Sequence, residues 1–207
     1  MTAVGSPTFA AGKITNGVTL ATAKFLYAAN TATQSLSNSV MTVEAWVKYT
    51  TNPASTTKPL VIVSKSANSI TANLGWIFGA IKGSSTTKQK MVFWGSLNGT
   101  TFTKITATTS NTIATGTWYH LAMTFNKGTV TFYFNGVSSG TGTIGTAGSS
   151  VLYSSTADLS LGANSTAGTA GTTAANYLTG ALDEVRISQN LRYSNAFTPS
   201  TSAFTGD

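Results

Sequence analysis

Five carboxylates are the only acidic side chains in this 207-residue sequence, and they limit the acid–base chemistry available to it. They are Glu44, Asp158, Asp183, Glu184 and Asp207. Glycoside hydrolysis needs two carboxyl groups about 5 to 9.5 Å apart, one as the acid and one as the base or nucleophile. Asp183 and Glu184 are adjacent, so in a strand they would point to opposite faces. The pattern favours a protein that is not an enzyme, with a glycosidase as the weakest alternative.

The pair near the end of the chain also has a structural interpretation. Asp183 shares its phase with Val185 and Ile187, so we expect it to be buried and hydrogen-bonded. Glu184 and Arg186 share the other phase, and we expect them to pair with a neighbouring strand.

His120 is the single histidine, and the chain has no cysteine. A Ser-His-Asp triad would have to be built on His120. It lies in the middle of an apolar segment, opposite in phase to Leu121 and Met123, which favours a structural role on a sheet face. The missing cysteines exclude disulfides and thiolate metal sites, and one histidine is too few for a histidine-rich zinc site.

Sugar binding is the other chemistry that the side chains suggest. Flat aromatic rings with a few polar neighbours are typical of ligand sites, and they can stack on sugar rings. Trp76 and Trp94 fall in facing strands of a predicted hairpin, each beside a glycine that leaves room for its ring. We predict Trp76 and Trp94 as the glycan-binding residues, with packing in the core as the alternative for both.

Charge is sparse and positive. Charged residues make up 8% of the chain, well below the usual quarter, and the net charge is +7. A surface of hydroxyl, amide and small apolar groups suits closely packed particles or contact with neutral polymers such as glycans. Lys82, Lys88 and Lys90 are the nearest approach to a basic cluster, and no nucleic-acid motif accompanies them. We therefore expect solvated hairpin lysines and no nucleic-acid partner.

Strand-like segments dominate the chain. They are rich in Val, Ile, Thr and aromatic residues and are bounded by Gly, Asn, Ser or Pro, and no long segment has a period of 3.6. The predicted strands are 17–28, 40–49, 59–65, 75–82, 90–96, 102–107, 118–126, 129–135, 159–162 and 178–188. Asn98-Gly99 and Asn135-Gly136 mark tight turns. This pattern predicts an all-β, antiparallel two-sheet sandwich.

We expect residues 1–207 to form one domain, with an N-terminal arm over 1–16 and an extended tail over 190–207. Residues 52–58 and 163–176 read as loops, the second long and rich in Gly, Ala and Thr. The N-terminus lacks a basic start followed by an apolar stretch, so we expect no secretory signal and synthesis in the cytoplasm. No apolar segment approaches the ~18 residues of a membrane span.

Five blocks, in order along the chain, resemble laminin-G-like domains of the concanavalin A-like lectin/glucanase jelly rolls. The blocks are Thr42–Lys48 (TVEAWVK), Gly116–Ala122 (GTWYHLA), Phe132–Val137 (FYFNGV), Leu159–Gly162 (LSLG) and Leu178–Ile187 (LTGALDEVRI). The resemblance implies a jelly roll with Trp46 and Trp118 buried. Glycosidases of this fold typically carry an E-x-D-x-x-E strand, and this sequence has none.

The resemblance also raises the question of calcium, which many laminin-G-like domains bind at the sandwich rim. Calcium prefers six to eight oxygen ligands, usually with carboxylates among them. Asp158, just before the LSLG block, and Asn164, just after it, are the residues we predict for such a site. We otherwise expect no cofactor.

The segment Leu191–Pro199 (LRYSNAFTP) is similar to segments that end jelly-roll domains in bacteriophage tail and particle proteins. The resemblance implies a non-enzymatic structural protein on the virion surface, decorating a capsid or tail. Its partners would be other virion proteins in a repeated lattice or further copies of itself, and host-surface glycans. A stand-alone lectin-like carbohydrate-binding module is the alternative.

Overall fold

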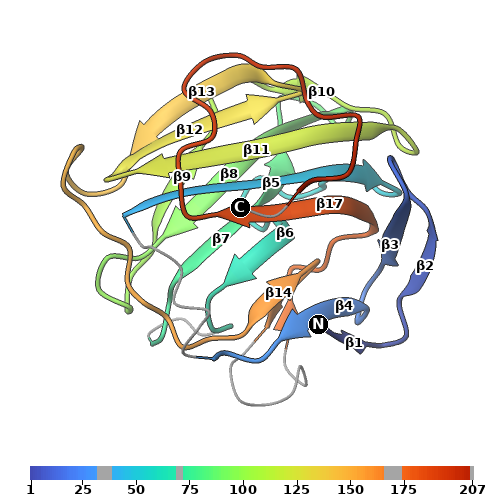
Figure 1. Cartoon of the computed structure of the whole chain (residues 1–207), viewed down its shortest axis with the longest axis horizontal. Helices are drawn as coiled ribbons and strands as arrows, with labels where there is room; N and C mark the ends of the chain where they lie inside the picture. The colour runs from blue at the N-terminus through green and yellow to red at the C-terminus, as the bar shows by residue number, and fades with distance from the viewer. Residues whose placement is uncertain (32–38, 69–71, 166–173, 206–207) are drawn as a thin grey trace.

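The computed structural model describes residues 1–31, 39–68, 72–165 and 174–205. Every regular element in these residues is a β-strand, and most strands belong to two large antiparallel sheets that face each other (Figure 1). The predicted all-β, two-sheet sandwich is therefore confirmed. None of the described residues forms a helix long and apolar enough to cross a membrane.

The eight-stranded sheet is called sheet A. Its order is β1 (Thr2–Val4), β4 (Phe25–Ala28), β14 (Leu159–Leu161), β6 (Leu60–Lys65), β7 (Trp76–Lys82) and β8 (Lys88–Gly95). Two short strands, β9 (Thr103–Thr106) and β10 (Asn111–Thr112), pair with different parts of β8.

The seven-stranded sheet, called sheet B, lies in front of sheet A in Figure 1. Its order is β13 (Val137–Thr143), β12 (Thr129–Phe134), β11 (Trp118–Asn126), β5 (Val40–Tyr49), β17 (Gly180–Ser188), β3 (Asn16–Leu20) and β2 (Thr8–Ala11). A small ladder of β15 (Asn164–Ser165) and β16 (Ala174–Ala175) stands beside them.

Alternation of side chains builds one core between the sheets. In β5, Val43, Ala45 and Val47 point inward, and in the paired strand β11 so do Leu121 and Met123. Their partners from sheet A include Phe78 on β7 and Phe93 on β8. Burying these apolar faces against each other drives the two sheets together. The same alternation sends every second residue to the outer face of its sheet, where ligands can reach it.

Some predicted elements need correction. The segment 17–28 is two strands, because the chain turns at Ala21–Lys24 and passes from sheet B to sheet A. Residues 137–143 form β13 although they are small and polar, since the tight turn after β12 feeds them directly into pairing. Residues 1–16 contain β1 and β2, which are edge strands of the two sheets. The tail forms no strand and passes over the outer face of sheet B (Figure 1).

A β-bulge in β17 changes the predicted phase of its side chains. Asp183 pairs with Trp46 and Arg186 with Glu44, so three steps along β17 match two along β5. The extra residue is accommodated by a positive φ of 49° at Glu184. Asp183 and Arg186 consequently share the outer face of sheet B, whereas simple alternation would separate them.

Candidate functional site

The candidate ligand site is a groove on the outer face of sheet A. It consists of three adjoining hollows of about 410, 130 and 420 Å³. The first and second share Trp94 and Lys104, and the second and third share Thr56, Ile81 and Thr106. The groove therefore follows β8 from Trp94 toward Lys90, about 13 Å for four residues of a strand.

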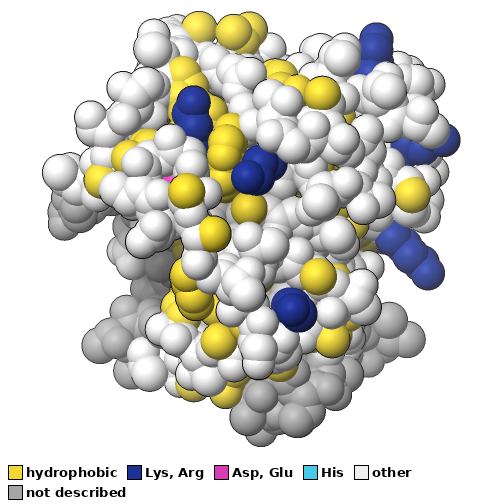
Figure 2. Space-filling view, turned by 90° about the vertical axis from the view of Figure 1, so that its right-hand side faces the viewer, with side chains coloured by type: hydrophobic (Ala, Val, Ile, Leu, Met, Phe, Trp, Pro, Cys, Tyr) yellow, Lys and Arg dark blue, Asp and Glu magenta, His cyan; other side chains and the backbone are white. Residues whose placement is uncertain are grey.

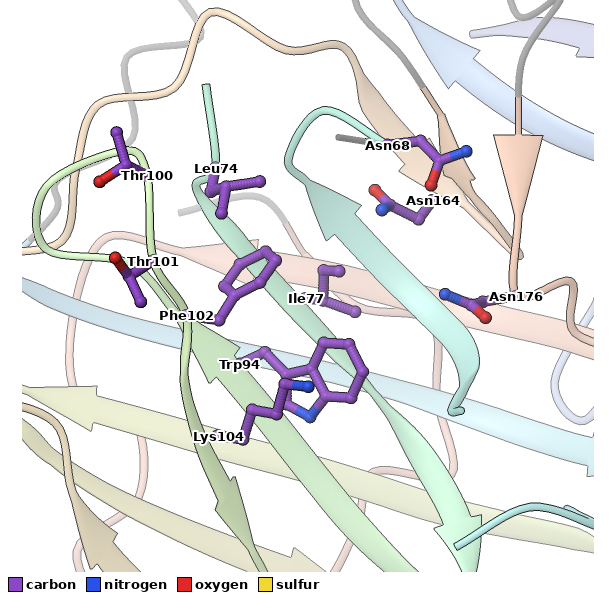
Figure 3. Close-up of a pocket in the computed structure, with 10 residues that line it drawn as sticks. All are labelled: Asn68, Leu74, Ile77, Trp94, Thr100, Thr101, Phe102, Lys104, Asn164 and Asn176. Atoms are coloured by element: carbon purple, nitrogen blue, oxygen red, sulfur yellow. The ribbon is translucent and has the colours of Figure 1, made fainter. Parts of the chain in front are cut away.

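The floor of the groove is built from outward residues of the adjacent strands β7, β8 and β9, and in the first two hollows its residues on β7 and β8 are apolar. Ile77 on β7 pairs with Trp94 on β8, and Trp94 pairs with Lys104 on β9. Ile77 and Val92 are almost fully buried, whereas the Trp94 ring is half-buried and faces the hollow (Figure 3). Phe102 stands beside Trp94, with ring centroids 5.9 Å apart and planes tilted by 54°. The two rings supply an angled apolar contact surface.

Lys104 covers part of this surface. Its ammonium lies 4.2 Å from the centroid of the Trp94 ring, a cation–π contact, and its side chain crosses in front of the ring in Figure 3. The lysine side chain is exposed, so it can swing away without disturbing the fold.

One wall of the groove is held by the turn predicted at Asn98-Gly99. The side-chain oxygen of Asn98 accepts hydrogen bonds from the backbone N–H groups of Thr100 (2.9 Å) and Thr101 (3.0 Å). Gly99 supplies the positive φ of 78° that the turn needs. The two threonines consequently project into the hollow opposite the asparagine side (Figure 3).

A similar turn shapes the wall of the second and third hollows. The Ser55 hydroxyl accepts hydrogen bonds from the backbone N–H groups of Thr57 (3.1 Å) and Lys58 (2.9 Å). The Ser55 carbonyl also accepts from the backbone N–H of Lys82 on β7. The loop that was predicted over residues 52–58 is thereby tied to the sheet, and its Thr56 lines the groove.

Amide side chains form the far end of the first hollow. Asn68, Asn164 and Asn176 lie together across the floor from Phe102 (Figure 3). Asn164 and Asn176 come from the described ends of the predicted loop 163–176, so this loop contributes to the site; its residues 166–173 lie outside the described structure. Amide groups both donate and accept hydrogen bonds, which suits hydroxyl-rich ligands.

The two tryptophans predicted as a joint platform lie on opposite faces of sheet A. Trp76 pairs with Gly95, one position beyond Trp94, and the side chains of successive strand residues point in opposite directions. Trp76 is 2% exposed and stacks on Phe93 in the core, with centroids 6.3 Å apart. The prediction for Trp76 as an exposed platform residue is therefore wrong. Trp94 faces the groove, and its role in binding stays a prediction.

The residues predicted for calcium have separate partners. Asp158 accepts a hydrogen bond from the backbone N–H of Asn30 (3.2 Å), whereas the side-chain oxygen of Asn164 accepts from the Ser64 hydroxyl (2.8 Å). The described residues contain no group of three or more acidic, histidine or cysteine side chains that could hold a metal.

A buried lysine, Lys65, donates hydrogen bonds to the oxygen atoms near Asp158. The Lys65 ammonium donates to the Asn30 side-chain oxygen (2.8 Å) and to the Ala157 carbonyl (2.7 Å). Burial lowers the pKa of Lys65, and the neighbouring Asp158 carboxylate offsets part of that effect. Because the chain supplies its own cation here, the arrangement does not fit a calcium ion.

A buried charged cluster lies on the outer face of sheet B, under the tail. Glu44 is fully buried and accepts hydrogen bonds from His120 Nε2 (3.1 Å), Tyr193 Oη (2.8 Å) and Arg186 Nε (2.8 Å), with Arg186 Nη2 at 2.7 Å. Burial alone would raise the pKa of Glu44, but these hydrogen bonds and the Arg186 charge outweigh it, so the pKa is lowered. The cluster holds an ionised carboxylate under the tail.

Aromatic side chains of the tail seal this cluster from water. Phe197 and Tyr193 stack with centroids 3.5 Å apart, and Phe197 also meets the edge of the His120 ring at 5.7 Å. Phe204 lies over Arg186 at 3.9 Å. Burial and the Glu44 hydrogen bond raise the pKa of Tyr193 to about 12. His120 is therefore part of a structural anchor, as the sequence indicated.

The adjacent acids Asp183 and Glu184 also have structural roles, because each accepts hydrogen bonds from the backbone of a distant segment. Asp183 is 5% exposed and accepts hydrogen bonds from the backbone N–H groups of Lys13 (2.7 Å) and Ile14 (2.9 Å). Glu184 accepts from the backbone N–H of Phe204 in the tail, and not from a neighbouring strand as expected. Arg186 does pair across to β5, through Glu44. No acidic residue in the described part of the chain lines the groove.

The comparisons with known proteins agree with this architecture. The family model described as the concanavalin A-like lectin/glucanases superfamily matches residues 25–195. No curated protein was matched by sequence.

Three solved structures illustrate the fold relationship. Domain 4 of AbnA, a GH43 extracellular arabinanase from Geobacillus stearothermophilus solved with arabinotriose, is 22% identical with a TM-score of 0.61, covering 90% of this chain and 76% of that one. A heptameric SAP-like pentraxin from Limulus polyphemus is 16% identical (TM-score 0.52; coverage 79% and 67%). The enzymatically active domain of bacteriophage CBA120 tailspike protein 2 is 18% identical (TM-score 0.58; coverage 88% and 27%). At these identities the likeness shows a common fold alone.

Proposed function

We propose that this chain, which belongs to the concanavalin A-like lectin/glucanase superfamily, binds carbohydrate in the groove on the outer face of sheet A. The observation that carries the proposal is the half-buried Trp94 ring beside Phe102, flanked by threonine and asparagine side chains (Figure 3). An aromatic surface with a few placed polar groups is the usual composition of a small-molecule or sugar site.

Each part of the groove has a distinct task in this proposal. The Trp94 and Phe102 rings contact the apolar faces of sugar rings, and the half-buried Asn68 and Asn176 exchange hydrogen bonds with hydroxyl groups. The hydrogen-bonded turns at Asn98 and Ser55 fix the walls before the ligand arrives, which reduces the entropy lost on binding.

The same groove supports binding without hydrolysis. A glycosidase needs two carboxyl groups beside the bond to be cleaved. In the described chain, Glu44 is sealed under the tail and Asp183 and Glu184 are engaged on the side of sheet B. Asp158 lies 5% exposed beside Asn30, outside the groove lining. We therefore propose a binding protein, and turnover of a polysaccharide by the purified chain would contradict this.

The test compares two tryptophan variants by a glycan array followed by titration calorimetry. Trp94→Ala should weaken binding of any captured glycan by about thirtyfold, the effect of losing a central aromatic contact worth about 2 kcal/mol. Trp118→Ala is the matched control, because Trp118 also lies under a lysine, Lys48, but on the outer face of sheet B. If the wild type and Trp94→Ala bound the glycan with equal affinity, binding in this groove would be refuted.

We also propose a virion surface as the setting, with other virion proteins or further copies of this chain as partners and host-surface glycans as ligands. The support is the tail segment Leu191–Pro199, the sparse charge visible as separate dark-blue side chains in Figure 2, and the fold shared with a phage tailspike domain. Mass spectrometry of purified particles tests this setting. A copy number that matches a capsid or tail lattice is expected, and absence from particles would refute it.

A further inference from the structure

The groove carries positive charge along its whole length. Lys104 lies in the first and second hollows, and Lys82 and Lys90 line the third. Lys104 is exposed and Lys90 is half-buried on the outward face of β8, so both ammonium groups can reach a ligand. Lys82 has the inward phase of Phe78 and Ala80, and it borders the third hollow only at the end of β7. None of these three lysines forms a salt bridge with an acidic side chain of the described residues.

Acidic groups are kept away from the same surface. The described carboxylates of Glu44, Asp183 and Glu184 bind the tail or the N-terminal segment on the side of sheet B. Asp158 faces Asn30 and the internal Lys65 ammonium. With a net charge of +7 and no described acid in the groove, the electrostatic potential there favours anions.

Because Lys104 lies over the Trp94 ring, the charge of a sugar affects how well it can stack on that ring. A neutral sugar that stacks on the covered part of Trp94 must displace the ammonium and lose the cation–π contact. A sugar that carries a carboxylate or sulfate offers the displaced ammonium an anionic partner beside the ring. The acidic sugar thus recovers the interaction that a neutral sugar loses.

We propose that the groove selects acidic polysaccharides, with Lys104 acting as a charge-sensitive cover on Trp94 and Lys90 contacting a further anionic group along the polymer. This proposal rests on the carbohydrate-binding function above and specifies its ligand class. The length of the groove along β8 suits several linked sugars, so a polymer is bound better than its monomer.

The experiment measures binding by calorimetry and affinity electrophoresis at low and high salt. The central pair of probes is polygalacturonate and its methyl-esterified form, which differ in charge. Hyaluronan and chondroitin sulfate extend the acidic set, arabinan and dextran form the neutral set, and an oligothymidylate tests nucleic acid. We expect at least one acidic polymer to bind about tenfold or more tightly than every neutral one, and salt to weaken it.

Charge-removing variants locate the effect. Lys104→Gln and Lys90→Gln should each weaken binding of the acidic polymer by about tenfold. Lys48→Gln is the matched control, because it removes the same charge and a similar lysine–tryptophan contact, Nζ to the Trp118 centroid at 4.9 Å, from sheet B. Unchanged melting temperatures establish that the variants are folded.

The outcomes separate the two proposals. A neutral glycan bound best, and lost in Trp94→Ala, would keep the carbohydrate-binding function and refute the acidic selectivity. Acidic binding that is equal in Lys104→Gln and Lys48→Gln would place the charge recognition elsewhere and refute the role of Lys104. Tighter binding of oligothymidylate than of every polysaccharide, or no binding of any glycan, would overturn both.

Discussion

Replacing Glu44 by glutamine should destabilise the protein severely and release its tail. Glu44 is fully buried and its two oxygens accept hydrogen bonds from His120, Tyr193 and Arg186. Glutamine keeps one acceptor but turns an NH₂ group toward these donors and leaves the Arg186 charge without a counterion. Breaking a buried ion pair costs about 3–5 kcal/mol, and we expect about 3 because Arg186 stays 16% exposed.

The assay is thermal and urea unfolding combined with limited proteolysis of residues 190–205. A loss of about 3 kcal/mol corresponds to a melting temperature about 6–12 °C lower in a domain of this size. Glu184→Gln is the control, because it removes one negative charge just as Glu44→Gln does. Its side chain is half-exposed and keeps an acceptor for the Phe204 N–H, so the loss should stay below about 1 kcal/mol.

The dependence on pH supplies a second check. Folding lowers the pKa of Glu44 from its ordinary value of 4.5, so the ionised form is stabilised in the folded state. The resulting stability is fully present above pH 4.5 and is lost as the pH falls through the lower, folded-state value. The difference between wild type and Glu44→Gln should therefore shrink in acid. A difference that is independent of pH, or a melting temperature within about 2 °C of wild type, would refute the reasoning.

Three further outcomes follow from the structure. Trp76→Ala should lower the unfolding free energy by about 3–5 kcal/mol because it opens a cavity in the core, whereas Trp94→Ala on the outer face should cost about 1 kcal/mol or less, both measured by urea unfolding. Lys65→Met should cost about 1–3 kcal/mol by leaving the buried Ala157 carbonyl without its donor. Calcium or a chelator should leave the wild-type melting temperature unchanged, and a calcium-induced rise would contradict the site assignment. Gly136→Ala should make the tail more sensitive to protease, since a Cβ on this residue, at φ +78°, would collide with the Phe197 carbonyl; an unaltered digestion pattern would contradict this.

The types of neighbouring residues along the chain were enough to predict many of the strands and turns. Segments rich in Val, Thr and aromatic residues predicted strands over 40–49, 118–126 and 129–135, which are β5, β11 and β12 in the structure, because such side chains pack well on a half-buried sheet. Asn98-Gly99 predicted the turn that now forms a groove wall, since these residues tolerate the positive φ of a tight turn. The family blocks, in order, predicted the jelly roll that the family match confirms.

The candidate site could be predicted only in part. The sequence singled out Trp94, and alternation alone put Trp76 and Trp94 on one hairpin, but register decides their faces: Trp94 pairs with Ile77, and Trp76 with Gly95. A closer count along the hairpin would have separated them. No local signal predicted that Lys104, from a different strand, would lie over the Trp94 ring.

What the sequence by itself determined was the inventory: an all-β chain with few acids, a positive balance, no cysteine and one histidine. Tertiary structure alone decided which of these groups meet. Glu44 and Tyr193 lie 149 positions apart in the chain and share a hydrogen bond, and Lys65 reaches the Ala157 carbonyl 92 positions away. Such contacts depend on how strands order themselves across two sheets and where a bulge shifts their register, and neither is written in the local pattern of residues.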